Sequence, residues 1–164
     1  VHARAGKPAH IRLKLNSILD EEFCAKFYEA SQAGVKIELL VRGICSVQAG
    51  VEGLSENITA HSVLGRFLEH SRIFYFLNDG DPEYWIGSAD LMHRNLDRRV
   101  ECLVRIFDPT HVAQLEEILN IGLSDQTQSW RLTGQRWLRQ AVAEDGMRLI
   151  DAHSHHLSKN LKGS

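Results

Sequence analysis

The pattern that most constrains the fold lies in residues 10–41, where the sequence predicts a strand, a helix and a second strand in close succession. Residues 10–16 alternate between apolar and polar side chains, and this period of two is typical of a half-buried strand. Residues 35–41 are dense in Val, Ile and Leu, which favours a buried strand. Because a strand, helix and strand at this spacing form a βαβ unit with parallel strands, we expect an α/β fold.

The ends of this unit carry their own signals. Asp20 can cap the helix at its start, and Gly34 is placed to end it as a glycine just past the last turn. Arg42 and Gly43 then leave the carboxyl end of the second strand. Ligands usually bind at that edge of open α/β sheets.

The remaining chain predicts further elements. In chain order these are a loop over 46–57, a short helix or irregular segment over 62–70, strands over 72–77 and 84–88 that form a hairpin about a turn at 78–82, a strand over 99–106 and a helix that begins at Asp108-Pro109. We expect residues 1–125 to form one domain. Residues 126–164 are expected to be an extension packed on it that frays after about residue 153.

Composition narrows the function classes. The chain has 164 residues, 43% of them hydrophobic, which suits one globular domain. Its net charge of −2 argues against a nucleic-acid partner. Three cysteines without a CxxC spacing argue against a zinc site or a disulfide framework. We expect neither a membrane-spanning helix nor a signal peptide, and the first residue, Val1, suggests a piece of a longer protein.

Two segments could handle an anion. Arg42 stands at a strand end before a glycine, where its guanidinium could bind phosphate oxygens bidentately, or could instead pair with a neighbouring carboxylate. His70 and Arg72 are two residues apart, so on a strand they would face one site, and Gly87-Ser88-Ala89-Asp90 follows. A His, a basic residue and a Gly-Ser-x-Asp/Asn turn resemble the phospholipase D motif in outline. The alternative is a structural histidine.

A third segment, residues 94–101, clusters three arginines in a slightly acidic protein. Arg94, Arg98 and Arg99 could line a path for a polyanion. The alternative is a solvated loop in which Asp97 and Glu101 compensate these charges.

Taken together, ordered segments between residues 5 and 125 resemble the polyphosphate kinases of the phosphohistidine type. The matching stretches are residues 6–9, 14–17, 28–37, 41–45, 53–58, 65–72, 86–90 and 94–101, and more faintly 130–139. The resemblance implies a phospholipase-D-like fold, with a mixed β-sheet flanked by helices. It implies that residues 1–125 are the second of two such catalytic half-domains, and that the phosphorylated histidine lies on the other, outside this chain.

The same resemblance implies reversible transfer of the terminal phosphate of ATP to inorganic polyphosphate, with Mg²⁺. The implied partners are ATP or ADP, polyphosphate, the remaining domains of the same enzyme and further copies of it. It also implies a cytoplasmic location, peripheral at the inner membrane face. We expect the chain alone to be inactive, because it holds half of the active site.

Residue by residue, the resemblance implies that His70 is catalytic and contacts the nucleotide phosphates, and that Arg42 binds phosphate. Arg72, Arg99 and Glu101 are also expected to bind ATP or its phosphates, and Arg94 and Arg98 are expected to lie along the polyphosphate path. No metal ligand is expected in this chain.

Three positions depart from the family pattern. Gln48 replaces a usual arginine, His61 lies where basic residues are usual, and Leu91 replaces a tryptophan, so polyphosphate handling is expected to differ. Two other functions remain open. One is a phospholipase-D-like phosphodiesterase acting as a homodimer, and the other is a non-catalytic polyphosphate-binding module.

Overall fold

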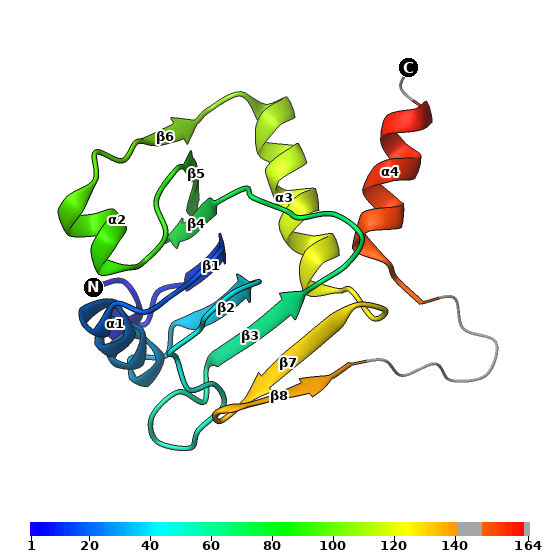
Figure 1. The fold of residues 1–164 in the computed structure, drawn as a ribbon. Coiled ribbons are helices and arrows are strands. Elements are labelled where there is room, and N and C mark those ends of the chain that lie inside the picture. The colour runs from blue at the N-terminus through cyan, green and yellow to red at the C-terminus, as the bar shows by residue number, and fades with distance from the viewer. Residues whose placement is uncertain (141–148, 163–164) are drawn as a thin grey trace.

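The computed structural model describes residues 1–140 and 149–162, and its centre is a sheet of eight strands in the order β6-β5-β4-β1-β2-β3-β7-β8 (Figure 1). The strands are β1 (Ala9–Leu15), β2 (Lys36–Val41), β3 (Ile58–Val63), β4 (Ile73–Asn78), β5 (Asp81–Gly87), β6 (Leu103–Ile106), β7 (Ser129–Thr133) and β8 (Arg136–Arg139). The helices are the 3-10 turn η1 (Ala3–Ala5), α1 (Glu21–Gln32), α2 (His93–Arg98), α3 (Pro109–Leu123) and α4 (Ala152–Lys162).

The predicted βαβ unit is confirmed, because β1 and β2 pair in parallel with Leu13 opposite Leu39. β2 also pairs in parallel with β3, whereas β4 runs antiparallel to β1 and β7 runs antiparallel to β3. The sheet is therefore mixed. These directions bring the carboxyl ends of β1, β2, β3 and β5, and the amino ends of β4 and β6, to one edge of the sheet.

One face of the sheet packs against α1 through an apolar core. Leu13 and Leu39 are at most 2% exposed and belong to the same cluster as Phe27 of α1. The helix begins where predicted, because the Asp20 carboxylate accepts a hydrogen bond from the Phe23 backbone at 3.0 Å. Gly34 follows with a φ of 88°, a left-handed conformation that suits glycine and turns the chain into β2.

The opposite face packs against α3, as Figure 1 shows, and carries polar side chains. Arg12 on β1 is buried and donates to Asn120 of α3. A smaller apolar cluster of Ile73, Tyr84 and Leu119 lies beside it. α3 begins at the predicted place, with Asp108 as its cap.

The β4–β5 hairpin is also confirmed, with Asn78 opposite Asp81. Its two turn residues, Asp79 and Gly80, have positive φ angles of 53° and 93°. An Asp-Gly pair with this geometry matches the twist of the flanking strands.

Between β2 and α3, one predicted strand is shorter than expected and one strand was missed, while the irregular alternative for residues 62–70 is confirmed from residue 64 onward. The strand predicted over residues 99–106 covers only 103–106, and helix α2 immediately precedes residue 99. Residues 58–63 form strand β3, which the sequence pattern did not reveal, while residues 64–72 are irregular. β3 lies between β2 and β7, and its apolar–polar alternation covers only the four residues 58–61, which is a short signal between the loop expected over 46–57 and the segment over 62–70.

Residues beyond 125 form more regular secondary structure than the sequence predicted. β7 pairs with β3, so the sheet continues across the boundary placed at residue 125. The expected fraying after residue 153 is wrong for 152–162, which form α4. Among the residues that the structure describes, none of the helices combines the length and apolar character that crossing a bilayer requires.

Candidate active site at the strand ends

The carboxylate of Asp90, which follows β5, organises the site. It accepts hydrogen bonds from the backbone and the side chain of Asn16 at 2.7 and 3.0 Å. Arg72 donates to the same carboxylate from Nε at 3.3 Å and from Nη2 at 2.9 Å. Asp90 therefore ties the end of β1 to the start of β4 through a two-pronged arginine contact.

Arg42 joins this group through Asn16. Its Nε donates to Asn16 Oδ1 at 2.7 Å, which leaves the Nη groups of the half-buried guanidinium outside that contact. Gly43 follows at a close approach, because a Cβ there would lie 2.7 Å from the Asn16 carbonyl oxygen. The glycine after Arg42 thus allows β1 and β2 to end side by side.

His70 is exposed and lies against Arg72. Arg72 Nη1 is 2.7 Å from His70 Nδ1 and donates to the His70 carbonyl at 3.0 Å. The two side chains therefore lie together, as expected from their spacing. However, they lie in the irregular segment before β4 rather than on a strand, and the guanidinium brings them together.

Positive charge exceeds negative charge around Asp90. Burial alone would raise the pKa of Asp90, but hydrogen bonds from Arg72 and Asn16 outweigh it and hold that pKa below its ordinary value. Asp90 is therefore a carboxylate whose oxygens are already bound by donors. Arg42 and Arg72 together exceed its single charge, so the edge can accept an anion.

Glu101, two residues before β6, forms a second carboxylate group. It accepts hydrogen bonds from the Ser88 hydroxyl and, at 2.7 Å, from Asn95 of α2. These two bonds, the one from Ser88 first, lower the pKa of Glu101. Glu101 also feels the charges of Arg99 and Arg72, so the structure places it next to the Asp90 group.

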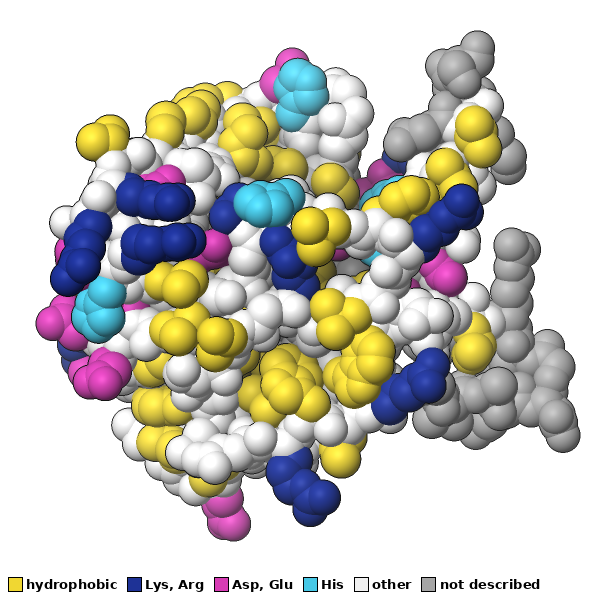
Figure 2. All heavy atoms as spheres, in the orientation of Figure 1, with side chains coloured by type: hydrophobic (Ala, Val, Ile, Leu, Met, Phe, Trp, Pro, Cys, Tyr) yellow, Lys and Arg dark blue, Asp and Glu magenta, His cyan; other side chains and the backbone are white. Residues whose placement is uncertain are grey.

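The three arginines of the basic segment lie beside this group. Arg94 and Arg98 are exposed on α2, and Arg99 is exposed immediately after it. Figure 2 shows Lys and Arg side chains gathering over this helix. The structure thus brings Arg42, His70, Arg72 and Glu101 to one edge and sets the other arginines along its flank.

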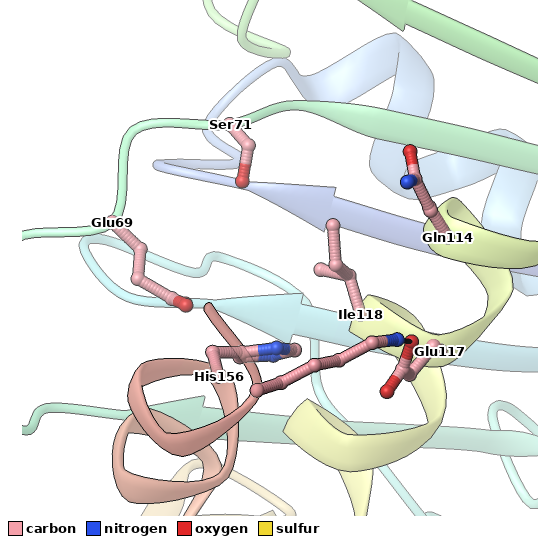
Figure 3. A pocket seen from close by; sticks show the side chains of 7 residues that line it. Glu69, Ser71, Gln114, Glu117, Ile118 and His156 are labelled. Atoms are coloured by element: carbon pink, nitrogen blue, oxygen red, sulfur yellow. Dashed lines mark hydrogen bonds and ion pairs between the residues drawn. The ribbon is translucent and has the colours of Figure 1, made fainter. Parts of the chain in front are cut away.

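An ion pair with the sheet holds the loop that carries His70. Lys14 of β1, which is 4% exposed, forms an ion pair with Glu69 at 3.1 Å. Glu69 and Ser71 line a pocket of about 400 Å³ whose other walls are α3 and α4 (Figure 3). Glu69 and His156 both point into it (Figure 3). Burial lowers the pKa of His156, which favours its neutral form.

The residues present do not fit a magnesium site of their own. Within residues 1–140 and 149–162, there is no group of three or more His, Cys, Asp or Glu side chains that could hold a metal ion. The oxygens of Asp90 already accept hydrogen bonds from Arg72 and Asn16, and those of Glu101 from Ser88 and Asn95.

The three departing positions lie in different surroundings. Leu91 is buried, and its carbonyl accepts hydrogen bonds from Leu19 and Asp20. His61 is half-buried on β3, where burial and the nearby Arg131 lower its pKa. Gln48 is fixed through its backbone, which donates to the Tyr28 hydroxyl at 2.9 Å.

Sequence reasoning did not single out Asn16 or Asp90. Both stand in segments that carried the resemblance, and Asp90 ends the Gly-Ser-x-Asp turn. That signal was available, but it could not show that both arginines are positioned through these two residues.

Comparison with known proteins gives consistent matches. The family model described as polyphosphate kinase C-terminal domain 2 matches residues 1–150. A curated polyphosphate kinase of Streptomyces coelicolor is 58% identical over 149 residues, which is 90% of this chain and 20% of that protein. The chain therefore spans about a fifth of that relative's length.

Two solved structures extend the comparison. The crystal structure of polyphosphate kinase from Porphyromonas gingivalis matches with a TM-score of 0.88 and 32% identity, over 99% of this chain and 25% of that one. A phospholipase D family member, Nuc from Salmonella typhimurium, matches with a TM-score of 0.52 and 15% identity, over 84% of this chain and 86% of that one. The second match concerns the fold alone. The predicted phospholipase-D-like fold is confirmed.

Proposed function

The chain belongs to the polyphosphate kinase family, and on that premise we propose that it supplies one half of an active site that transfers the terminal phosphate of ATP to inorganic polyphosphate. The other half, with the histidine that carries the phosphoryl group, lies on a partner domain outside this chain. The transfer is reversible, and the chain alone is inactive.

One observation carries this proposal. A continuous chain of contacts runs along the strand ends, from Arg42 through Asn16, Asp90 and Arg72 to His70. His70 is the exposed last member of this chain. Phosphoryl transfer depends mostly on positioning and on neutralising charge, and this arrangement fixes two guanidinium groups before any ligand binds.

In the proposed reaction, the bond between the terminal phosphorus of ATP and the bridging oxygen breaks, and ADP leaves. The phosphorus first bonds to the partner domain's histidine nitrogen; this N–P bond then breaks as the phosphorus bonds to the terminal oxygen of polyphosphate, and the histidine is restored. Arg42 holds oxygens of the transferring phosphate, and His70 exchanges a proton with a phosphate oxygen. Arg72 keeps His70 in place, since its guanidinium already binds Asp90.

The surroundings take supporting roles in the proposal. Arg99 and Glu101 lie next to the transferring group, and Arg94 and Arg98 attract the polyphosphate chain along α2. Magnesium accompanies the nucleotide phosphates, with protein ligands outside this chain. The working enzyme is an oligomer of the full-length chain in the cytoplasm, peripheral at the inner membrane face.

A complementation assay tests the proposal. This chain is mixed with the separately produced remainder of the same protein, and polyphosphate synthesis from ATP with magnesium is followed. Activity is expected only when both pieces are present, and His70→Ala is expected to lower it at least about a hundredfold. His111→Ala on α3 is the matched control and should leave the rate unchanged, because His111 is exposed and pairs with Asp108 at the helix cap.

Synthesis by the chain alone would refute the half-site proposal. Full activity of the mixture with His70→Ala would show that His70 has no catalytic role. Polyphosphate binding that survives His70→Ala but not Arg42→Gln, in a mixture that synthesises nothing while the intact enzyme does, would favour the binding-module alternative.

A further inference from the structure

α4 lies beyond residue 150, where the match to the family model ends, yet it contacts the loop that carries His70. In Figure 1 the segment between β3 and β4 passes next to the first turn of α4. The contact therefore joins the C-terminal helix to the candidate active site.

The contact is made by His153, which is only 7% exposed. Its Nδ1 accepts a hydrogen bond from the Phe67 backbone N–H at 3.0 Å. The Phe67 ring packs on the imidazole with the ring centroids 5.5 Å apart. Because Nδ1 is the acceptor, the neutral ring carries its proton on Nε2.

The loop is shaped to receive this ring. A Cβ at Gly65 would lie 2.6 Å from His153 Nδ1 and 2.8 Å from its Cε1. Any side chain at position 65 would therefore push the imidazole away from the Phe67 N–H. The hydrogen bond from the Phe67 backbone to His153 therefore requires glycine at position 65.

Asp125 fixes the start of α4, one residue before His153. The Ala152 backbone donates to the Asp125 carboxylate at 2.7 Å. The same carboxylate accepts the Thr127 and Gln128 backbone N–H groups at 2.9 and 2.8 Å, so it also shapes the turn before β7. One turn further along, His155 contacts Glu117 of α3 at 3.0 Å. His153 is therefore held by the sheet and by α3.

Two further contacts hold the loop between Phe67 and β4. Glu69 pairs with Lys14 at 3.1 Å, and His70 contacts Arg72 at 2.7 Å. Phe67 is three residues before His70, so its anchoring fixes the incoming side of the same segment.

We propose that His153 is a positioning residue for the active site: it holds the backbone of residues 65–67 and thereby fixes where His70 stands. α4 is then part of the catalytic unit. The effect on catalysis rests on the proposed function, whereas the hold on the loop does not.

The test compares two nearly isosteric variants in the full-length enzyme, His153→Asn and His153→Leu. Both variants lose the ring. Only the Asn side chain has an oxygen that can accept the Phe67 hydrogen bond in place of Nδ1. We expect amide hydrogen exchange at Phe67 to become about tenfold faster in His153→Leu and to stay near wild type in His153→Asn. We expect kcat to fall about tenfold or more in His153→Leu, with KM for ATP nearly unchanged. Ser158→Ala, on the exposed side of α4, should change neither.

The outcomes separate the two proposals. Equal exchange at Phe67 in the Asn, Leu and wild-type enzymes would overturn the role of His153, even if His70→Ala abolishes activity. Faster exchange in His153→Leu with unaltered kcat, in an enzyme that also tolerates His70→Ala, would support the hold on the loop and refute the proposed catalytic role of His70. Equal loss of kcat in Asn and Leu, with unchanged exchange at Phe67, would mean that the ring acts by packing alone and would overturn the proposal.

Discussion

The two faces of the sheet are built from different chemistry although the same strands make both. On β1 and β2, Leu13 and Leu39 face α1 in an apolar core, while Arg12, Lys14 and Glu38 point to the side covered by α3. The α1 face gains stability from the burial of apolar area. The α3 face buries a smaller apolar cluster around Leu119, and the charges that lie beside it must be paired to be tolerated there.

This difference indicates a division of roles. The apolar face holds α1 against the strands through its buried side chains. The polar face reaches the loop that carries His70, because Lys14 pairs with Glu69 one residue before His70. Paired charges have fixed partners and directions, so they can set the position of a loop that apolar packing would leave less defined.

The largest expected effect is on the apolar face. Leu39→Ala should lower the free energy of unfolding by about 2–5 kcal/mol, because it empties space in a core where Leu39 is fully buried. Denaturant unfolding of the 164-residue chain measures it. Leu138→Ala on β8, where the side chain is 48% exposed, is the control and should cost far less. Equal costs would break the comparison.

A smaller effect is expected on the polar face, and it depends on pH. A hydrogen bond with His10 is the main cause that lowers the pKa of Glu38 from 4.5 to about 2, and Lys36 adds to it. Because the folded-state pKa is the lower one, the stabilisation is fully present above about pH 4.5 and is lost as pH falls toward about 2.

Glu38→Gln should therefore destabilise the chain by up to about 3 kcal/mol at pH 7, and the difference from wild type should shrink as the pH falls toward 2. Unfolding free energies measured at a series of pH values test this. A difference that does not change with pH would contradict the assigned role of the Glu38 charge. Glu29→Gln, in an exposed pair with Lys26, provides the control and should show little effect at any pH.

The smallest expected loss of stability would sharpen the division of roles most. Lys14→Met should cost about 1–2 kcal/mol, because the partly exposed Glu69 loses its 3.1 Å ion pair and keeps the longer 3.9 Å contact with His153 Nε2. In the full-length enzyme it should also lower polyphosphate synthesis at a temperature where the fold is intact. Lys26→Met on α1 is the matched control, since its pair with Glu29 is exposed. Loss of stability without loss of activity would remove the link between the polar face and the site.

Several elements could be predicted because their signals are local. The alternation over residues 10–16 and the Asp-Gly turn at 79–80 gave β1 and the β4–β5 hairpin, and Asp20 and Asp108 marked the starts of α1 and α3. Each of these signals acts within a few residues, through a helix cap that binds nearby backbone N–H groups, a turn conformation or a strand period.

The missed elements depend on distant partners. β7 and β8 form only because β7 completes the sheet beside β3, and α4 is fixed by Asp125 and Glu117. Residues 99–102 alternate like a strand, but Ser88 and Asn95 take up Glu101, and the strand begins only at Leu103. No pattern within these segments could reveal those contacts.

The sequence by itself determined the family, the parallel β1–β2 pair and the residues at the strand ends, because these depend on local periodicity and on long ordered segments of resemblance. The tertiary structure decided how those residues are arranged. Asp90 joins Arg72 to Asn16, and His153 of α4 accepts a hydrogen bond from Phe67, which lies 86 residues earlier in the chain. Such contacts form between segments that only the folded sheet brings within hydrogen-bonding distance, so their geometry could not be read from the order of the residues.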